Sequence, residues 1–369
     1  MEFSAPCLLG IEGLLANELK FAGLENVRAE NGRVLFSGDH TAMARANLCS
    51  RLAQRVYILL SEFRATDFDT LFEGVKAIDW SRYLSADDSF PVNGGSLDSK
   101  LSSIPACQKI VKKSVVESLK AHYHIDWFPE TGGVHQIQFR IFKDRVSIML
   151  DTTGAALNKR GYRAMSGDAP LRETLAAAMT ELARVRADHI VIDPFCGSGT
   201  ILIEAAQKAL GIMPGMNRHF AFEEWSQVDP TILASEKERA LAGVRTDCAF
   251  HAYGYDIDDE ALEIARKNAA LAGVGDRITF EKRDIRDYAE GFERASVITN
   301  PPYGERMLEL SEARELYRVA GEKFARKPYH SYTIISPDDQ FEKIFGRPAD
   351  RRRKLYNGTL RCQVYQYYK

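Results

Sequence analysis

The chain has 369 residues, 45% of them hydrophobic and 27% charged, with a formal net charge of −2 at pH 7. These values indicate a globular protein with a real core, organised in two or three domains, and give no overall basic signal for nucleic acid. The absence of any apolar run of about 18 residues or more excludes a membrane-spanning helix, and we expect neither a secretory signal nor a membrane partner. Six scattered cysteines without a Cys-x-x-Cys pair argue against a metal site and favour a reducing cytoplasm.

Residues 1–55 predict a small α+β unit of the ferredoxin-like type. Its helices and strand are expected at Glu12–Lys20, Gly32–Gly38 and His40–Leu52, with Asp39 opening the second helix.

Residues 56–160 predict a second α+β unit. Its strands are expected at Arg55–Leu60, Phe90–Asn93, Gln136–Phe142 and Arg145–Leu150. Its helices are expected at Thr70–Val75 and Pro105–His122, and the segment Gly94–Ser103 between two of these elements is expected to be a loop. That loop would bring Lys100 near lysines of the following helix, which suits either a phosphate-gripping surface or an ordinary solvated helix face.

From residue 161 to residue 369 strands and helices alternate, which is typical of a doubly wound, Rossmann-like α/β domain. The strand His189–Asp193 leads through a glycine-rich turn into a helix, and ligands of such sheets bind at the carboxyl ends of the strands. The turn lacks the Gly-Lys-Ser/Thr of a phosphate-binding loop, and Leu202 stands where a dinucleotide fingerprint needs Gly or Ala. The third candidate cofactor is S-adenosylmethionine, which carries an amine and no phosphate. Asp193 is the carboxylate that would bind the amine.

Two further strand ends carry a carboxylate. Asp256 suits ribose hydroxyls, and Asp284 suits an adenine amino group, although strand-end aspartates more often cap a helix or a turn. The predicted cofactor contacts are Asp193, Pro194, Phe195, Cys196, Gly197, Gly199, Thr200, Asp256, Ile257, Asp284, Ile285 and Asn300.

The apolar run Ala295–Thr299 ends in Asn300-Pro301-Pro302-Tyr303. The prolines stop the strand and leave a rigid turn with carbonyls, one amide and one aromatic ring. This set suits a planar group with an exocyclic amine: the Asn300 side-chain oxygen and the Pro301 carbonyl would accept its N–H bonds, and Tyr303 would stack on it. The alternative is a proline-rich turn that only caps a strand.

The pair Asp193–Thr200 and Asn300–Gly304 resembles the amino-group S-adenosylmethionine-dependent methyltransferases. The segments Leu157–Arg163, Ala169–Leu175, Pro214-Gly215 and Lys354–Gly358 make the whole chain similar to the THUMP-domain methyltransferases related to the 23S ribosomal RNA guanine-N2 enzymes. Relatives of this group are often labelled N6-adenine DNA methylases.

The resemblance implies a class I methyltransferase domain at 161–369 with a mostly parallel seven-stranded sheet and a C-terminal antiparallel hairpin. It also implies a THUMP RNA-binding domain at 56–160, behind the ferredoxin-like unit. Some relatives carry a second methyltransferase domain after the first, and we expect that second activity to be absent because the chain ends at Lys369.

The implied function is methyl transfer from S-adenosylmethionine to an exocyclic base amine in RNA, above all guanine N2 of 23S ribosomal RNA. Transfer RNA guanine N2, DNA adenine N6 and a non-catalytic role in ribosome assembly stay open, as does the oligomeric state.

Basic residues gather from Lys343 to Lys369, with eight Lys or Arg against one acid. Such a basic patch can bind the phosphates of a nucleic acid. The alternative is that these residues only keep a hairpin arm solvated. The candidate RNA contacts of the whole chain are Lys100, Lys109, Lys112, Lys113, Lys159, Arg160, Arg351, Arg352 and Arg353.

Overall fold

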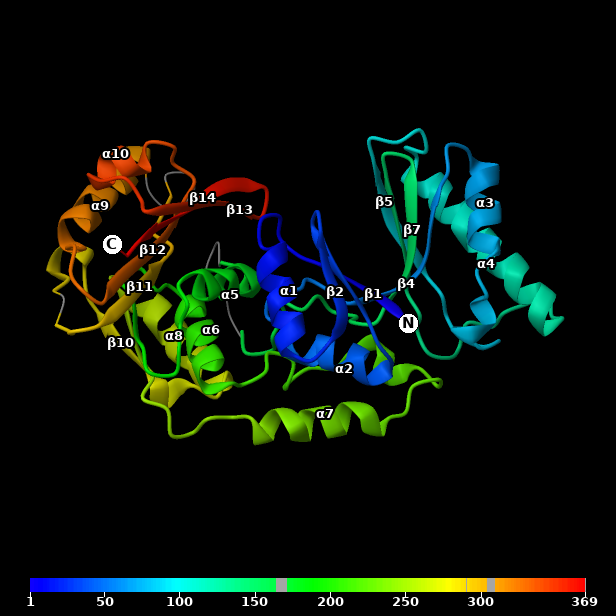
Figure 1. Ribbon diagram of the computed structural model, residues 1–369, viewed down its shortest axis with the longest axis horizontal. Coiled ribbons are helices and arrows are strands. Elements are labelled where there is room, and N and C mark those ends of the chain that lie inside the picture. Colours follow the sequence, from blue (N-terminus) through cyan, green and yellow to red (C-terminus); the bar gives the residue numbers. More distant parts are fainter. Residues whose placement is uncertain (164–170, 290, 304–308, 369) are drawn as a thin grey trace.

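The computed structural model describes residues 1–163, 171–289, 291–303 and 309–368. These residues form two seven-stranded sheets, which lie in separate parts of an elongated molecule (Figure 1). No helix in the described ranges is both long enough and apolar enough to cross a membrane.

The first sheet joins both N-terminal units in the strand order β2-β3-β1-β4-β7-β6-β5. Its strands are β1 (Glu2–Pro6), β2 (Glu25–Glu30), β3 (Arg33–Ser37), β4 (Tyr57–Arg64), β5 (Val92–Leu97), β6 (Ile137–Phe142) and β7 (Arg145–Asp151). Strand β1 pairs with β3 on one side and with β4 on the other, so that Phe3 lies opposite both Phe36 and Ile58. The expected boundary at residue 55 therefore falls inside one continuous sheet.

Two pairs of helices cover parts of this sheet. They are α1 (Glu12–Phe21) and α2 (His40–Cys49) in the first unit, and α3 (Phe68–Lys76) and α4 (Ile104–Tyr123) in the second, where a short 3-10 turn, η1 (Trp80–Arg82), also lies. Helix α2 ends three residues earlier than predicted, because Ser50 has an extended backbone and its hydroxyl donates to Glu18.

The expected loop Gly94–Ser103 starts four residues later than predicted, because β5 continues through Gly94 and Gly95 to Leu97, and residues from Asp98 to Ser103 connect the strand to α4. The strand pairs in parallel with β6, and a Cβ atom at Gly94 would lie 2.4 Å from the side chain of Phe139. Glycine here serves a close approach between a strand and an aromatic ring.

The second sheet has the order β10-β9-β8-β11-β12-β14-β13. Its strands are β8 (Ile190–Asp193), β9 (His251–Asp256), β10 (Ile278–Lys282), β11 (Ala295–Thr299), β12 (His330–Ser336), β13 (Arg351–Asn357) and β14 (Leu360–Tyr367). The strands from β10 to β12 are parallel, whereas β14 pairs antiparallel with β12 and β13, as the sequence predicts.

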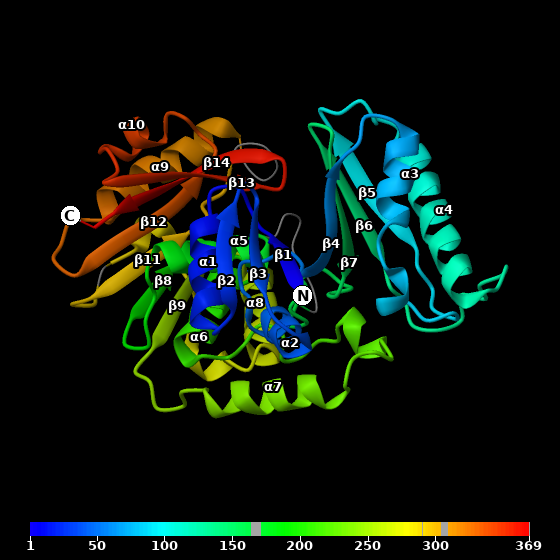
Figure 2. The ribbon, with the colours of Figure 1, turned by 45° about the vertical axis from the view of Figure 1, so that its right-hand side comes forward.

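Helices lie on both faces of this sheet (Figure 2). Helices α5 (Glu173–Leu182), α6 (Thr200–Leu210) and α8 (Asp259–Leu271) contribute to one buried cluster, and α9 (Leu310–Lys323) and α10 (Phe341–Phe345) contribute to another. Short 3-10 turns are η3 (Gly275–Arg277) and η4 (Ile285–Asp287).

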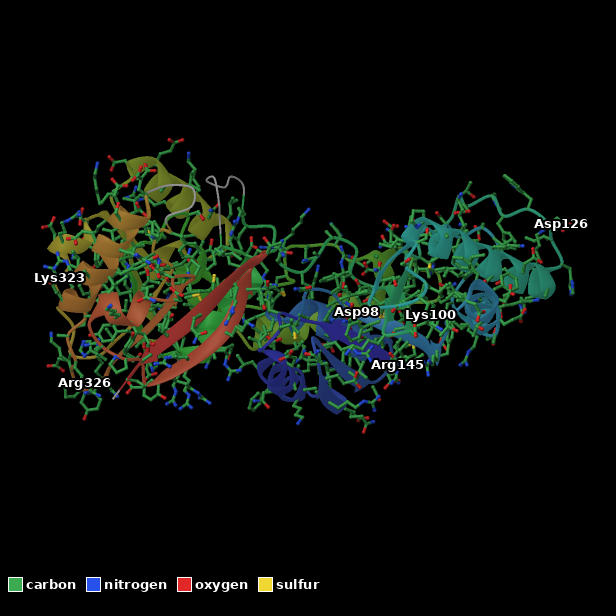
Figure 3. All side chains as sticks on the ribbon, turned by 90° about the horizontal axis from the view of Figure 1, so that it is seen from above. Asp98, Lys100, Asp126, Arg145, Lys323 and Arg326 are labelled. Carbon is green, nitrogen blue, oxygen red and sulfur yellow. The ribbon has the colours of Figure 1, made fainter. Side chains whose placement is uncertain are left out.

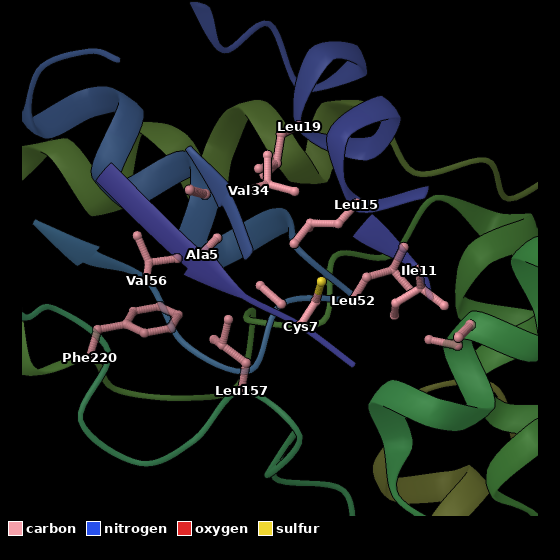
Figure 4. Close-up of a cluster of buried hydrophobic side chains, with 14 of the residues drawn as sticks. Ala5, Cys7, Ile11, Leu15, Leu19, Val34, Leu52, Val56, Leu157 and Phe220 are labelled. Carbon is pink, nitrogen blue, oxygen red and sulfur yellow. The ribbon is translucent and has the colours of Figure 1, made fainter. Parts of the chain in front are cut away.

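The segment between α6 and β9 carries η2 (Ala221–Glu224) and α7 (Thr231–Ala242) and reaches back across the N-terminal units. Phe220 of this segment enters the core beside Ala5 and Val56, together with Leu157 (Figure 4). Trp225 stacks on His135 at 4.5 Å and donates its indole N–H to the Val134 carbonyl.

Candidate active site

The carboxyl ends of β8 and β11 are joined at their last residues. The Thr299 hydroxyl donates to Asp193 Oδ1 at 2.6 Å, and the Phe195 N–H donates to the same oxygen at 3.1 Å. Asp193 is buried, and this desolvation raises the pKa of its carboxyl to about 7 in spite of both hydrogen bonds. Asn300 follows Thr299 directly, so the two sequence motifs meet at one edge of the sheet.

The glycine-rich turn after β8 is fixed by the neighbouring strand. The Cys196 N–H donates to the Tyr255 carbonyl at 3.0 Å, and the Gly197 N–H donates to Asp256 Oδ2 at 2.9 Å. Gly197 has φ +49°, and a Cβ atom there would meet nothing within 4 Å. The turn therefore has the close-approach surface that a ligand needs.

Cys196 is buried, and desolvation raises the pKa of its thiol well above the usual range. A protonated, buried thiol is a poor nucleophile, so Cys196 is best described as a small packing residue of the turn.

The other two strand-end aspartates also make local hydrogen bonds. Asp256 Oδ1 accepts from the Asp258 N–H, and Asp284 accepts from both the N–H and the guanidinium of Arg286, the latter at 2.9 Å. Of the two isoleucines that follow them, Ile257 is 63% exposed and Ile285 is buried in the core. The Ile257 side chain is therefore accessible to a ligand at this edge, whereas the Ile285 side chain is not.

The Asn-Pro-Pro-Tyr turn is held by contacts that the sequence does not reveal. The Tyr303 hydroxyl donates to Asn300 Oδ1, and the Pro302 carbonyl accepts from the hydroxyl of Tyr317 at 3.2 Å. Burial near Cys362 and Tyr317 raises the pKa of Tyr303 well above its usual range. The amide oxygen of Asn300 keeps a second lone pair for another donor.

Sequence reasoning missed three supporting residues here. Thr299 bonds Asp193, Tyr317 on α9 bonds Pro302, and the Arg163 guanidinium donates to the Thr200 hydroxyl at 2.9 Å. Thr299 has a readable signal, since it lies beside Asn300 at a strand end, but no local pattern connects Tyr317 with the turn.

The nine candidate RNA contacts separate into two groups. Lys100, Lys109, Lys113, Lys159 and Arg351 are exposed. The others have partners within the protein: Lys112 pairs with Glu130 at 2.7 Å, Arg352 is exposed and pairs with Glu342 at 2.8 Å, and Arg353 donates to the Gly10 carbonyl.

The prediction for Arg160 is wrong. Arg160 is 3% exposed, because it lies between Arg51 of the N-terminal unit and Glu204 of α6, with which it forms a buried ion pair at 3.2 Å. Arg160 also donates to the Arg51 carbonyl.

This fold and site define a class of protein. A mostly parallel seven-stranded sheet with a terminal antiparallel hairpin, a glycine turn after β8, aspartates at the ends of β8 and β9 and just after β10, and Asn-Pro-Pro-Tyr after β11 together identify a class I S-adenosylmethionine-dependent methyltransferase.

Comparison with known proteins gives the family. Residues 160–366 match the RMKL-like methyltransferase domain, residues 2–57 the RlmL ferredoxin-like domain and residues 65–151 the THUMP domain. The chain belongs to this family of THUMP-domain methyltransferases.

Three relatives illustrate the match. The chain is 39% identical over 366 residues to "Putative RNA methyltransferase YpsC" of Bacillus subtilis, covering 99% of this chain and 95% of that protein. It is 34% identical to the ribosomal RNA large subunit methyltransferase K/L of Psychromonas ingrahamii, covering all of this chain and 50% of the relative. The crystal structure of SMU.472 complexed with SAH has a TM-score of 0.94 and 41% identity, covering 100% of this chain and 97% of that one.

The chain therefore spans about half the length of the K/L relatives that it matches, and nearly all of YpsC.

Proposed function

We propose that this protein transfers a methyl group from S-adenosylmethionine to an exocyclic amine of a base in RNA, and that the amine is N2 of a guanine in 23S ribosomal RNA. The observation that carries the proposal is the hydrogen bond from Thr299 to Asp193, which sets the amine-binding turn of Asn300 beside the carboxylate of the cofactor site. The THUMP domain and the names of the two curated relatives favour RNA over DNA.

The residues present fit the cofactor. Asp193 supplies a buried carboxylate for its amine, Asp256 a half-exposed carboxylate for the ribose, and Ile257 an exposed apolar side chain for the adenine ring. S-adenosylmethionine, when bound, supplies an electrophilic methyl group. Asp284 would accept from the adenine amino group after giving up part of its bonding to Arg286.

The role of the Asn300 turn is to prepare the nucleophile. The lone pair of an exocyclic amine is delocalised into the base, and acceptors on both N–H bonds favour the pyramidal form that attacks. We assign these acceptors to the free lone pair of Asn300 Oδ1 and to the Pro301 carbonyl, as preorganised electrostatic stabilisation. The base leaves its helix to reach them and stacks on the half-buried ring of Tyr303.

Mass spectrometry of modified nucleosides from a deletion strain tests this function. We expect ribosomal RNA from that strain to lose N2-methylguanosine at one position, and a plasmid copy of the wild-type gene to restore it. A copy carrying Asn300→Ala should not restore it. Loss of a nucleoside from transfer RNA or DNA instead, with ribosomal RNA unchanged, would overturn the assignment.

A further inference from the structure

The sheet of the THUMP domain has one face covered by helices and one face that is not. Phe63 of β4 packs against α3 so tightly that a Cβ atom at Gly74 would lie 2.3 Å from its ring. On β6 the buried residues Ile137, Phe139 and Ile141 alternate with less buried ones. Helices α3 and α4 lie on the side of the sheet that faces away from the methyltransferase domain (Figures 1 and 2).

The other face carries cations at the end of the sheet near the β6–β7 turn. Residues directly opposite across strands point to the same face, and Leu97, Phe142, Arg145 and Arg64 form one such row. Arg140 precedes Phe142 by two positions and so shares its face. We call Arg64, Arg140, Phe142, Lys143 and Arg145 the open face; Figure 3 shows Arg145 beside Lys100 and Asp98 of the adjoining loop.

On the solvent-exposed part of the open face, positive side chains outweigh negative ones. The side chains of Arg64 and Arg145 are 79% and 71% exposed and lie opposite each other. Like charges in that arrangement repel. The acids within this face, Glu62 and Asp144, are each only 17% exposed, and the exposed acid nearby, Asp98, lies in the adjoining loop together with Lys100. Glu62 already accepts from Arg33, Arg145 and Ser147, and Asp144 lies 3.9 Å from Arg64.

An aromatic ring lies within this group of cations. The half-buried ring of Phe142 has the Arg140 guanidinium 5.7 Å from its centre and the Lys143 ammonium 5.4 Å from it. Cations around an accessible ring are the combination by which proteins hold single-stranded nucleic acid: the cations take phosphates and the ring stacks on a base.

We infer that the open face is the RNA-docking surface of the THUMP domain, with Arg64, Arg140 and Arg145 on phosphates and Phe142 beneath a base. The inference rests on the proposed function for its ligand and adds the place of contact. It differs from the helix surface that the sequence predicts, because Lys109 and Lys113 lie on α4, which covers the opposite face.

The test compares two charge-matched double variants of the full chain, Arg140→Gln with Arg145→Gln on the open face and Lys109→Gln with Lys113→Gln on α4. The probe is in vitro transcribed 23S ribosomal RNA, and its dissociation constant is measured across a salt series. We expect the open-face variant to bind roughly tenfold more weakly, with a salt slope lower by about two, since each lost phosphate contact removes about one counterion. The α4 variant should match the wild type.

A third variant separates stacking from charge. Phe142→Ala should weaken binding without changing the salt slope, and Phe142→Tyr should bind like the wild type. Thermal melts of each variant confirm that it is folded. Equal affinity of the open-face variant and the wild type, or loss of affinity only in the α4 variant, would overturn the inference.

The two proposals fail separately. If the wild type methylates ribosomal RNA and the open-face variant does so with the same KM for the RNA, the docking surface is wrong and the proposed function stands. If the RNA binds through the open face and no guanine is methylated, the function is wrong and the surface stands.

Discussion

Asp193 is a carboxyl group shielded from water under a threonine hydroxyl, at the point where a cationic amine is expected to bind. Burial makes the protonated form more stable, whereas an ammonium partner favours the ionised form. We therefore expect cofactor binding to be linked to proton release at this residue.

This linkage predicts a pH dependence of cofactor affinity. Because the pKa of Asp193 is raised to about 7, affinity should increase by about tenfold between pH 6 and pH 8 as the carboxyl loses its proton. The folded protein binds more protons than the unfolded chain between the ordinary carboxyl pKa and about 7, so the ligand-free protein should lose stability as the pH rises through that window. Calorimetric titration measures the affinity. Asp193→Asn should bind weakly at both pH values, and a flat profile in the wild type would contradict the linkage.

A second residue-scale prediction concerns Tyr303, whose hydroxyl holds the Asn300 amide. Tyr303→Phe keeps the ring and removes this hydrogen bond, so we expect the rate of methyl transfer to fall by about tenfold with cofactor affinity unchanged. Asn300→Ala should lower the rate by about a hundredfold or more, also with near-normal cofactor binding. Single-turnover kinetics with saturating RNA distinguish the two. If the Tyr303→Phe enzyme is fully active, the hydroxyl does not contribute to catalysis, and the only role left for Tyr303 is stacking on the base.

At the scale of elements, the two glycines after β8 have different tasks. Gly197 faces open space, whereas a Cβ atom at Gly199, with φ +79°, would lie 3.1 Å from Phe280 and 3.2 Å from Ala265. We expect the first glycine to serve ligand approach, whereas the second serves the packing of the α6 N-terminus against α8 and the sheet.

The two alanine substitutions should therefore differ. Gly199→Ala should destabilise the protein by about 2 to 4 kcal/mol, from left-handed backbone strain and overpacking. Gly197→Ala should cost only about 1 to 2 kcal/mol and should weaken cofactor binding more than Gly199→Ala does. Urea unfolding and cofactor titration give the two readouts, and equal losses of stability would contradict this division of roles.

Local patterns predict elements well where the hydrophobic periodicity agrees with the glycine, proline and capping residues at the ends of the element. The order of strands and helices after residue 161, the acidic ends of β8 and β9 and the terminal hairpin follow from such patterns and from the resemblance, whereas Asp284 lies two residues beyond β10 and caps η4. Gly94 and Gly95 are misread as a loop because glycine is rare in strands. The reason for Gly94 is its close approach to Phe139, about 45 residues away in sequence, whereas a Cβ atom at Gly95 would meet nothing within 4 Å. Contacts of that kind leave no local pattern.

At the scale of the whole molecule, arginines near the domain junctions bind carbonyls and buried acids of other units. Arg51 donates to the Gln207 carbonyl, Arg160 pairs with Glu204, and Arg218 donates to the Ala156 carbonyl at 3.0 Å. A sequence shows such residues only as cations, which explains why Arg160 and Arg353 were expected on an RNA surface.

Removing one partner of the buried pair tests this structural role. Arg160→Met leaves Glu204 uncompensated and should destabilise the protein by about 3 to 5 kcal/mol. Adding Glu204→Met should restore most of that stability, since a buried pair can be replaced by apolar residues of similar volume. Lys159→Met, at the exposed neighbouring position, should change stability by no more than about 0.5 kcal/mol. Urea denaturation measures all three. A stable Arg160→Met protein with reduced RNA affinity would support the surface role instead.

The continuous N-terminal sheet also constrains how the chain folds. Strand β1 is flanked by β3 and β4, and β4 in turn pairs with β7, whose last residue is Asp151. During synthesis one edge of β1 stays unpaired until β4 is complete at Arg64, and one edge of β4 stays unpaired until β7 is complete at Asp151. An exposed strand edge is a template for association between chains. The ferredoxin-like and THUMP units should consequently fold as one cooperative body, and a fragment cut at residue 55 should aggregate rather than fold alone.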